Sequence, residues 1–485
     1  ETQIQLFSSQ KNYPQAIEWG LKILAQLGLR IPANPSKLQL LGALAKTKLL
    51  LSSRSIETLL QLPLMQNPQT IAAMRILDLL SYPAYDYSKS LLSWMAFVGV
   101  ERSVAEGNSI WSARAYSLYS VVLANVRDFA GSYQMGQLAL RLFDLLPNLA
   151  IEAKVKFDAA FFSQPCRQPL RDSLPLHQAA IQAAFASGDL LYGGKAYYGD
   201  CAVRMHLGEP LDELLVLAET YRQAIVVTQD RSSIFLMEIL YQLILKLQRP
   251  DLNPHHLLDS EATDLQTMAE LARDRGTLDL SVFYAYKQYL AYIFADIPTA
   301  LKYADLYVPF EHENSAPFSS IQLAYIEALI RLAAYPDSLP KQQQQLLARV
   351  TQIQKTFARR AKLAPFNLQV KSDLIAAERC RVLGEHSQAI ELYDRSIAGA
   401  MSDSDLQQAA FSNELAAKFY LGWGKEKIAA VYLQEAYYCF ARWGAIAKTE
   451  DLKNRYPQLL APILQPQQPE FNPLSTLTSI IDTSN

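Results

Sequence analysis

The sequence has few of the residues that build metal, disulfide or nucleophilic sites. Among 485 residues there are only six histidines and four cysteines, and no two cysteines form a CxxC pair. A zinc site or a disulfide framework is therefore not indicated, and reduced, mostly buried thiols are predicted. The adjacent His255 and His256 point in different directions on a helix, so they are predicted to be a polar helix start. His177 and His386 are predicted to be solvated or capping residues. The cysteines lie far apart, at Cys166, Cys201, Cys380 and Cys439.

Phosphoryl-transfer and nucleophile motifs are missing as well. The run Gly193-Gly194-Lys195 is followed by Ala196, so the hydroxyl that would hold Mg²⁺ is absent, and a structural turn is predicted there. The kinase catalytic loop, its DFG partner and the GxSxG elbow do not occur. His312, before Glu313, lacks the arginine and the downstream helix of a histidine-kinase phosphoacceptor. The segment is therefore predicted to be no enzyme, with no cofactor and no metal.

Charge excess and long apolar runs are also lacking. Lys plus Arg number 45 against 47 acidic residues, so the net charge of −2 gives no general attraction to nucleic acid or to an anionic membrane. The most apolar run, residues 90–100, is far shorter than the ~20 residues that span a bilayer. No signal peptide is recognisable, and the chain begins with Glu1. These features predict a soluble cytoplasmic protein, excised from a longer chain.

What the sequence does contain is helical periodicity. Half of the residues are hydrophobic, only 18 are glycine, and no alternation typical of strands persists, so the predicted class is all-α. Residues 413–460 read as two helices of a hairpin, broken at Gly424, with a third helix behind them. Small residues are expected where the helix axes approach closely and large ones between the turns. The predicted packing positions are Ala417, Tyr420, Ala429, Leu433 and Ala436.

This hairpin recurs along the chain. Going back along the chain from Gly424, each predicted helix–helix turn precedes the next by a multiple of about 40 residues, and the successive multiples are one, two, two, two and three. They lie at Gly384, Ala295, Gly208, Arg127 and Lys11. Around Gly384 the packing positions are Ala377, Ala389 and Tyr393. About eleven or twelve hairpins account for the chain, which predicts a right-handed α-solenoid of tetratricopeptide-like hairpins.

Three stretches stand out from the repeat. Residues 13–27 are predicted to be the second helix of a hairpin whose first helix is absent or truncated. The glutamine-rich run at 341–349 is predicted to be the polar face of an ordinary helix. Residues 461–485, rich in Pro, Gln, Ser and Thr, are predicted to be a linker after a repeat domain at 1–460. Most of the 26 tyrosines are expected to pack between helices, with a minority on a concave surface.

The stretch AAKFYLGWGKEKIAAVYLQEAYYCFARWGAIAKTEDLKNRYPQLL resembles the end of the helical-repeat region in very large bacterial signalling proteins. Upstream, AAMRILDLL, GQLALRLFDLLP and AAERCRVLGEHSQAIELYDRSI extend the likeness over nearly the whole chain. In that family a Ser/Thr kinase and an ATPase precede the repeats, and a GAF sensor and a histidine kinase follow them. None of the family's catalytic motifs falls inside this sequence.

The resemblance implies a non-catalytic scaffold and interaction region of a two-component signalling kinase. Its partners would be the flanking domains of the same chain and a regulatory protein or peptide, with neither nucleic acid nor membrane insertion involved. The alternative is a free-standing adaptor of tetratricopeptide type that binds peptides in its groove. A helical enzyme, the third possibility, has no motif in its favour.

Overall fold

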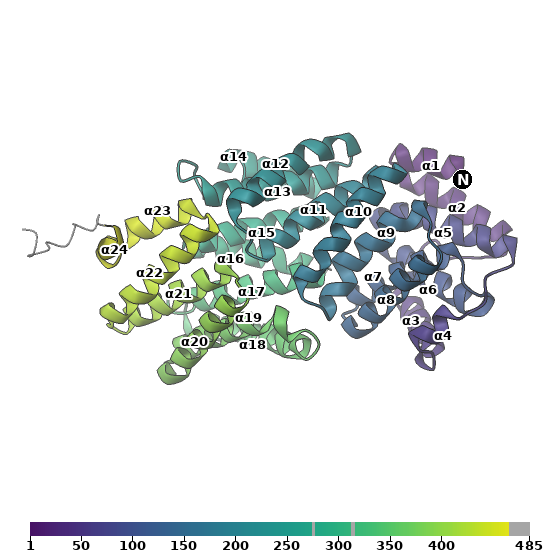
Figure 1. Ribbon diagram of the computed structural model, residues 1–485. Helices are drawn as coiled ribbons and strands as arrows, with labels where there is room; N and C mark the ends of the chain where they lie inside the picture. Colours follow the sequence, from purple (N-terminus) through teal and green to yellow (C-terminus); the bar gives the residue numbers. More distant parts are fainter. Residues whose placement is uncertain (274–276, 312–315, 465–485) are drawn as a thin grey trace, which may run out of the picture.

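The computed structural model describes residues 1–273, 277–311 and 316–464, and within these ranges the protein is built from α-helices without a β-strand (Figure 1). The predicted all-α class is confirmed. The first half of the array comprises α1 (Thr2–Ser9), α2 (Tyr13–Gln26), α3 (Lys37–Ser52), α4 (Ile56–Leu60), α5 (Pro68–Tyr87), α6 (Lys89–Glu106), α7 (Ile110–Asn125), α8 (Phe129–Leu145), α9 (Leu149–Asp158), α10 (Leu174–Ser187), α11 (Leu190–His206) and α12 (Leu211–Ile225). The second half comprises α13 (Arg231–Gln248), α14 (Glu261–Arg273), α15 (Thr277–Ile293), α16 (Ile297–Tyr307), α17 (Pro317–Ala334), α18 (Pro340–Ala361), α19 (Gln369–Leu383), α20 (His386–Ser402), α21 (Leu406–Gly422), α22 (Glu426–Trp443), α23 (Ile446–Arg455) and α24 (Pro457–Leu464).

Neighbouring helices pack as hairpins, for example α7 with α8, α15 with α16, α19 with α20 and α21 with α22. The hairpin turns share one backbone device, a residue in the left-handed region followed by an N–H that bonds back across the last helical turn. At Gly424 φ is +73°, and the Lys425 N–H donates to the Tyr420 carbonyl at 2.8 Å. This closure satisfies carbonyls that the end of a helix leaves free. Left-handed φ values occur at all six turn positions expected from the sequence: Lys11, Arg127, Gly208, Ala295, Gly384 and Gly424.

The expected packing positions lie inside the seams between helices. Those of α19 and α20 are Ala377, Ala389 and Tyr393, and those of α21 and α22 are Ala417, Tyr420, Ala429, Leu433 and Ala436; all are buried. The glutamine-rich run lies on α18, whose core-facing stripe is Leu346, Val350, Ile353 and Phe357. Its glutamines are therefore the polar side of an amphipathic helix, as predicted.

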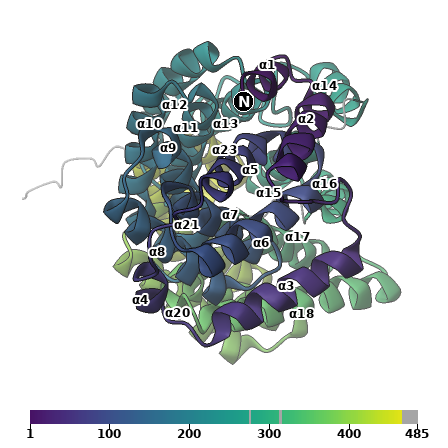
Figure 2. The same cartoon turned by 90° about the vertical axis from the view of Figure 1, so that its right-hand side faces the viewer.

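Four helices are buried over most of their length and form what we term the inner row: α7, α15, α17 and α21. In α7 every residue from Trp111 to Ala124 is buried. In α21 all residues from Gln407 to Tyr420 are buried except Lys418. Viewed from the end that carries the N-terminus, α7 lies in the middle of the other helices (Figure 2). The inner row is thus mostly buried in the described ranges. The tyrosines of α15 at positions 286, 289 and 292 are buried too, and Tyr286 and Tyr289 line a small cavity of about 40 Å³.

The last hairpins return to the middle of the chain and pack beside the inner row (Figure 1). Helix α23 packs on α13. The Trp443 Nε1–H donates to the Glu209 carbonyl at 3.1 Å, and the Lys448 ammonium donates to the Ile293 carbonyl at 2.7 Å. We call these two contacts the clasp. Both join residues far apart in the sequence, so they add ties that a strictly neighbour-to-neighbour stack of repeats lacks.

The buried side chains form two main hydrophobic cores. The smaller core runs from Ile4 to Val155, and the larger from Val121 to Leu460. They meet at α7 and α9. Helix α8 packs into the smaller core, whereas α17 and α18 pack into the larger one.

The structure differs from the sequence-based expectations at both ends of the chain. A first helix, α1, is present with eight residues and packs on α2, so the option that it is absent is wrong and the option that it is truncated stays a prediction. At the other end α24 reaches Leu464, past the boundary placed at residue 460. Pro462 removes one helix donor, but the fully buried Leu460 anchors the segment to the core. The rest of the predicted linker, 465–485, lies outside the described residues.

Two local predictions inside the array are also wrong. Gly193 and Gly194 lie within α11 rather than in a turn. A Cβ on Gly194 would stand 3.1 Å from the Ser233 side chain, so the glycine allows α11 and α13 to approach closely. The residues around His255 form turns and bends, and the next helix begins only at Glu261.

Candidate functional site

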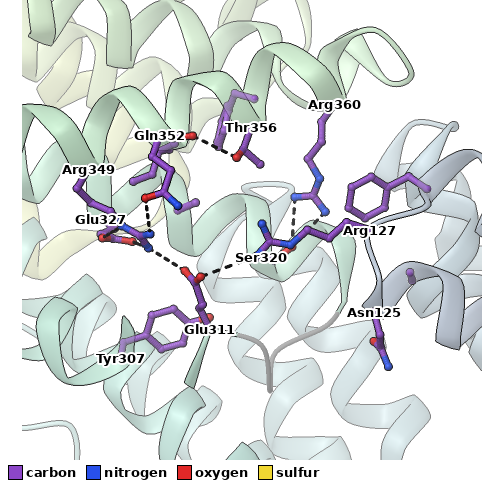
Figure 3. A pocket seen from close by; sticks show the side chains of 15 residues that line it. Asn125, Arg127, Tyr307, Glu311, Ser320, Glu327, Arg349, Gln352, Thr356 and Arg360 are labelled. Atoms are coloured by element: carbon purple, nitrogen blue, oxygen red, sulfur yellow. Dashed lines mark hydrogen bonds and ion pairs between the residues drawn. The ribbon is translucent and has the colours of Figure 1, made fainter. Parts of the chain in front are cut away.

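A charged cleft of about 120 Å³ opens between the α7–α8 turn on one side and α16, α17 and α18 on the other (Figure 3). Its charged lining residues are Arg127, Glu311, Glu327, Arg349 and Arg360, and its apolar wall includes Phe129, Ile353 and Phe357. Because α8 packs into the smaller core and α18 into the larger, the cleft lies where the two cores face each other. We call it the arginine cleft.

Helical periodicity explains why one helix supplies so much of this site. Arg349, Gln352, Thr356 and Arg360 recur at three- and four-residue intervals along α18, which places them on one face beside the core stripe. From the opposite side, Arg127 projects from a left-handed turn residue with φ of +63°. The same turn that ends α7 therefore also aims a guanidinium at the cleft.

Arg349 is fully paired. Its Nε donates to Glu327 at 2.7 Å, and its Nη2 donates to Glu327 at 2.9 Å and to Glu311 at 2.8 Å. Hydrogen bonding to Glu327 raises the pKa of Arg349 above its usual value. Arg331 also donates to Glu327, at 2.8 Å. The two carboxylates of the cleft are thus mostly engaged by arginines that are already in place.

Arg360 is held differently. Both terminal nitrogens donate to the Ser320 hydroxyl oxygen at 3.2 Å, and the guanidinium carbon lies 4.1 Å from the centre of the Phe129 ring. Among the described residues no carboxylate is within ion-pair distance of Arg360. Burial lowers its pKa to about 10, and the positive charge of Arg127 acts in the same direction. Two guanidiniums of like charge therefore converge on one opening (Figure 3).

A second group of charges is buried where the two cores meet. Arg114 donates from Nε to Asp78 at 3.2 Å and from Nη2 to the Tyr192 hydroxyl at 2.8 Å, and Nη1 pairs with Asp158. Lys154 completes the group by donating to Asp78 at 2.9 Å. All the charges in this Arg114 network have partners, and the geometry is that of a structural tie between α5, α7, α9 and α11.

The two histidines predicted to be solvated or capping lie in different environments. His177 is completely buried, neither ring nitrogen has a hydrogen-bond partner, and burial lowers its pKa to about 4. The expectation for His177 is therefore wrong, because the ring is packed against Phe157 and Phe161. His386 is partly exposed and lies against the Phe419 and Trp423 rings. The pair at positions 312 and 313 lies outside the described residues.

Neither the cysteines nor the possible metal ligands form a site in the ranges that the structure covers. All four cysteines are free and buried, in agreement with the prediction of buried thiols. No group of three or more His, Cys, Asp or Glu among the described residues is placed to hold a metal ion. None of the described helices is long and apolar enough to cross a membrane.

Sequence reasoning missed the arginine cleft because no motif marks it. Its signal is the spacing of Arg349 and Arg360, about three helical turns apart on a helix whose core stripe is already apolar. The repeat predicts a helix–helix turn at Arg127, but it does not predict which distant helix that turn faces.

The fold and site together define an all-helical protein of packed hairpins with a basic cleft between its two cores. No protein-family model matches the chain. The chain is 21% identical over 285 residues to the hybrid signal transduction histidine kinase G of Dictyostelium discoideum. The match covers 54% of this chain and 8% of that protein, so the chain spans a small part of the relative's length. The likeness relates the chain to a signalling kinase.

Proposed function

We propose that the chain is a non-catalytic helical-repeat region of a multidomain signalling kinase. In this proposal the hairpins form a right-handed, tetratricopeptide-like solenoid that links an upstream kinase and ATPase to a downstream GAF sensor and histidine kinase. The observation that carries the proposal is the similarity to a hybrid histidine kinase that is far longer than this chain. The hairpin packing and the resemblance of residues 416–460 to the end of such a repeat region support it.

The clasp indicates how such a region would act. A simple solenoid flexes because each unit contacts only its neighbours. Here the last hairpins are tied to the middle of the array through Trp443 and Lys448. Lys448 is fully buried and also pairs with Glu414 at 3.0 Å. We therefore propose that the array is a stiff coupler, which transmits placement between flanking domains instead of absorbing it.

The adaptor alternative is less well supported. A tetratricopeptide adaptor binds a peptide along an open inner surface, whereas most residues of the inner row are buried in the described ranges. The sequence encoded on either side of this chain separates the two possibilities directly. Kinase and sensor domains there support the coupler, and their absence would leave the adaptor.

The coupler is tested in the full-length parent protein with a matched pair of tryptophans. Trp443→Phe removes the clasp hydrogen bond, whereas Trp423→Phe changes a side chain that is 41% exposed in the turn before α22. We expect Trp443→Phe to alter stimulated histidine-kinase autophosphorylation severalfold and Trp423→Phe to leave it unchanged. Equal outputs from the two variants, with circular dichroism unchanged, would refute the coupling role.

The non-catalytic assignment is tested on the chain itself. Incubation with radiolabelled ATP and Mg²⁺ should leave the purified protein unlabelled. Stoichiometric label on the chain would contradict the proposal, and mass spectrometry would then locate the modified residue.

A further inference from the structure

The arginine cleft contains more positive charge than the described residues neutralise. Three arginines face two glutamates, and Arg349 engages both glutamates with hydrogen bonds of 2.7 to 2.9 Å. Arg127 reaches Glu311 only at 3.9 Å, with a side chain that is 60% exposed. Arg360 has no carboxylate partner among the described residues. Among the described residues one positive charge is therefore left over, at a place where burial makes an uncompensated charge costly.

The unpaired guanidinium is also held in a fixed orientation. A guanidinium carries five N–H donors in a rigid fork. Ser320 accepts from two nitrogens of Arg360, and the Phe129 ring supports one face of the group. The other donors of Arg360 have no acceptor among the described residues. A pinned, partly buried and unpaired arginine beside a second arginine is the arrangement that recognises an anion.

We propose that the arginine cleft binds the carboxylate of a small ligand or of a peptide end, between Arg127 and Arg360. A carboxylate is planar, matches the guanidinium fork and supplies the single negative charge that the cleft lacks. Phosphate carries more charge and would place the excess beside Glu311. The apolar wall of Phe129, Ile353 and Phe357 accommodates a short hydrocarbon portion next to the carboxylate.

Binding there ties together two parts of the array that pack into different cores. Arg127 belongs to the α7–α8 turn and Arg360 to α18, so one bound carboxylate bridges them. The regulatory meaning of this bridge rests on the proposed function, since a coupler whose stiffness depends on a ligand is a sensor. The binding itself is measured on the isolated chain. Its failure therefore leaves the domain-linking proposal intact, and failure of the kinase experiment leaves the binding result intact.

The test compares an acid with its neutral counterpart. N-acetyl-leucine carries a carboxylate and an apolar side chain, and N-acetyl-leucinamide has the same shape without the charge. We expect a saturable rise in melting temperature with the acid and none with the amide. Inorganic phosphate should bind at least tenfold more weakly than the acid. The acid's affinity should fall with added KCl, because the contact is ionic. A free small acid and a peptide end are distinguished by comparing the acid with a short peptide ending in leucine.

Two variants and one control complete the experiment. Arg360→Gln should weaken binding of the acid by about tenfold or more, which corresponds to the loss of a charged hydrogen bond. Arg127→Gln should weaken it as well. Arg359→Gln, on the same helix but exposed, should bind as the original chain does. Without ligand, Arg360→Gln should melt at the same or a higher temperature, because it removes an unpaired buried charge. Equal response to acid and amide, tighter binding of phosphate, or equal loss in all three variants would overturn the proposal.

Discussion

Removal of Arg114 is the most direct test of how much the Arg114 network stabilises the protein. The side chain is 2% exposed, and its two carboxylate partners are about as deeply buried, at 4% for Asp78 and 6% for Asp158. Substitution by leucine keeps much of the volume and removes the charge. Asp78 retains Lys154 at 2.9 Å, so the carboxylate left without a cation is Asp158, which keeps only the Ser117 hydroxyl at 2.7 Å.

The expected cost follows from this asymmetry. Breaking a buried ion pair by removing one partner costs about 3–5 kcal/mol, because the remaining charge stays buried without compensation. Arg114→Leu should therefore destabilise the protein by about 3–5 kcal/mol. Adding Asp158→Asn removes the stranded charge and keeps an acceptor for Ser117. The double variant should recover about 1–3 kcal/mol relative to Arg114→Leu.

Urea unfolding followed by circular dichroism measures these differences, and hydrogen exchange in α5, α7, α9 and α11 shows whether the loosening is local. Lys22→Ala is the matched control, because its ion pair with Glu18 is 59% and 62% exposed. That exposed pair should change stability by less than about 0.5 kcal/mol. The Arg114 network would not be the tie described here if Arg114→Leu cost no more stability than this control. The same would hold if the double variant were no more stable than Arg114→Leu.

Three further predictions concern single positions. Burial lowers the pKa of His177 to about 4, below its unfolded value of about 6.5. The contribution of the neutral ring to stability is therefore present above about pH 6.5 and is lost as the pH falls towards 4. His177→Leu should flatten that part of a stability–pH profile. Burial raises the pKa of Asp279 to about 6, so its contribution to stability is present below about pH 4 and is lost as the pH rises through 6. Asp279→Asn should keep the Ser232 hydrogen bond and raise the melting temperature at pH 7.5. A lower melting temperature of this variant would contradict the prediction. Ala429 is fully buried, so Ala429→Arg should destabilise the protein by about 1–3 kcal/mol or more. Lys425→Ala, on the exposed turn, should change stability by less than about 0.5 kcal/mol. Equal shifts in melting temperature for the two variants would show that the seam is misassigned.

The turns of the array were accessible from the sequence because their cause is local. A helix ends where a residue adopts left-handed backbone and the next N–H bonds back to a carbonyl five residues earlier. Gly384 and Gly424 mark such ends by their freedom of φ. At Ala295 and Arg127 the period of the repeat located the turn, although neither residue type favours that conformation. The seam positions, such as Ala429, follow from the same periodicity.

The clasp, the Arg114 network and the arginine cleft were decided only by tertiary structure. Helical periodicity tells which residues share a face, but it does not tell which distant helix meets that face. The cumulative rotation of many hairpins brings Trp443 to Glu209, and Arg127 to the cleft that Arg360 lines, and small changes in each crossing angle would separate them. His177 illustrates the same limit, since a histidine between polar and apolar neighbours is solvated or buried according to what packs over it. Local backbone chemistry determined the helices and their turns, and long-range packing determined which charges the protein buries, pairs or leaves open.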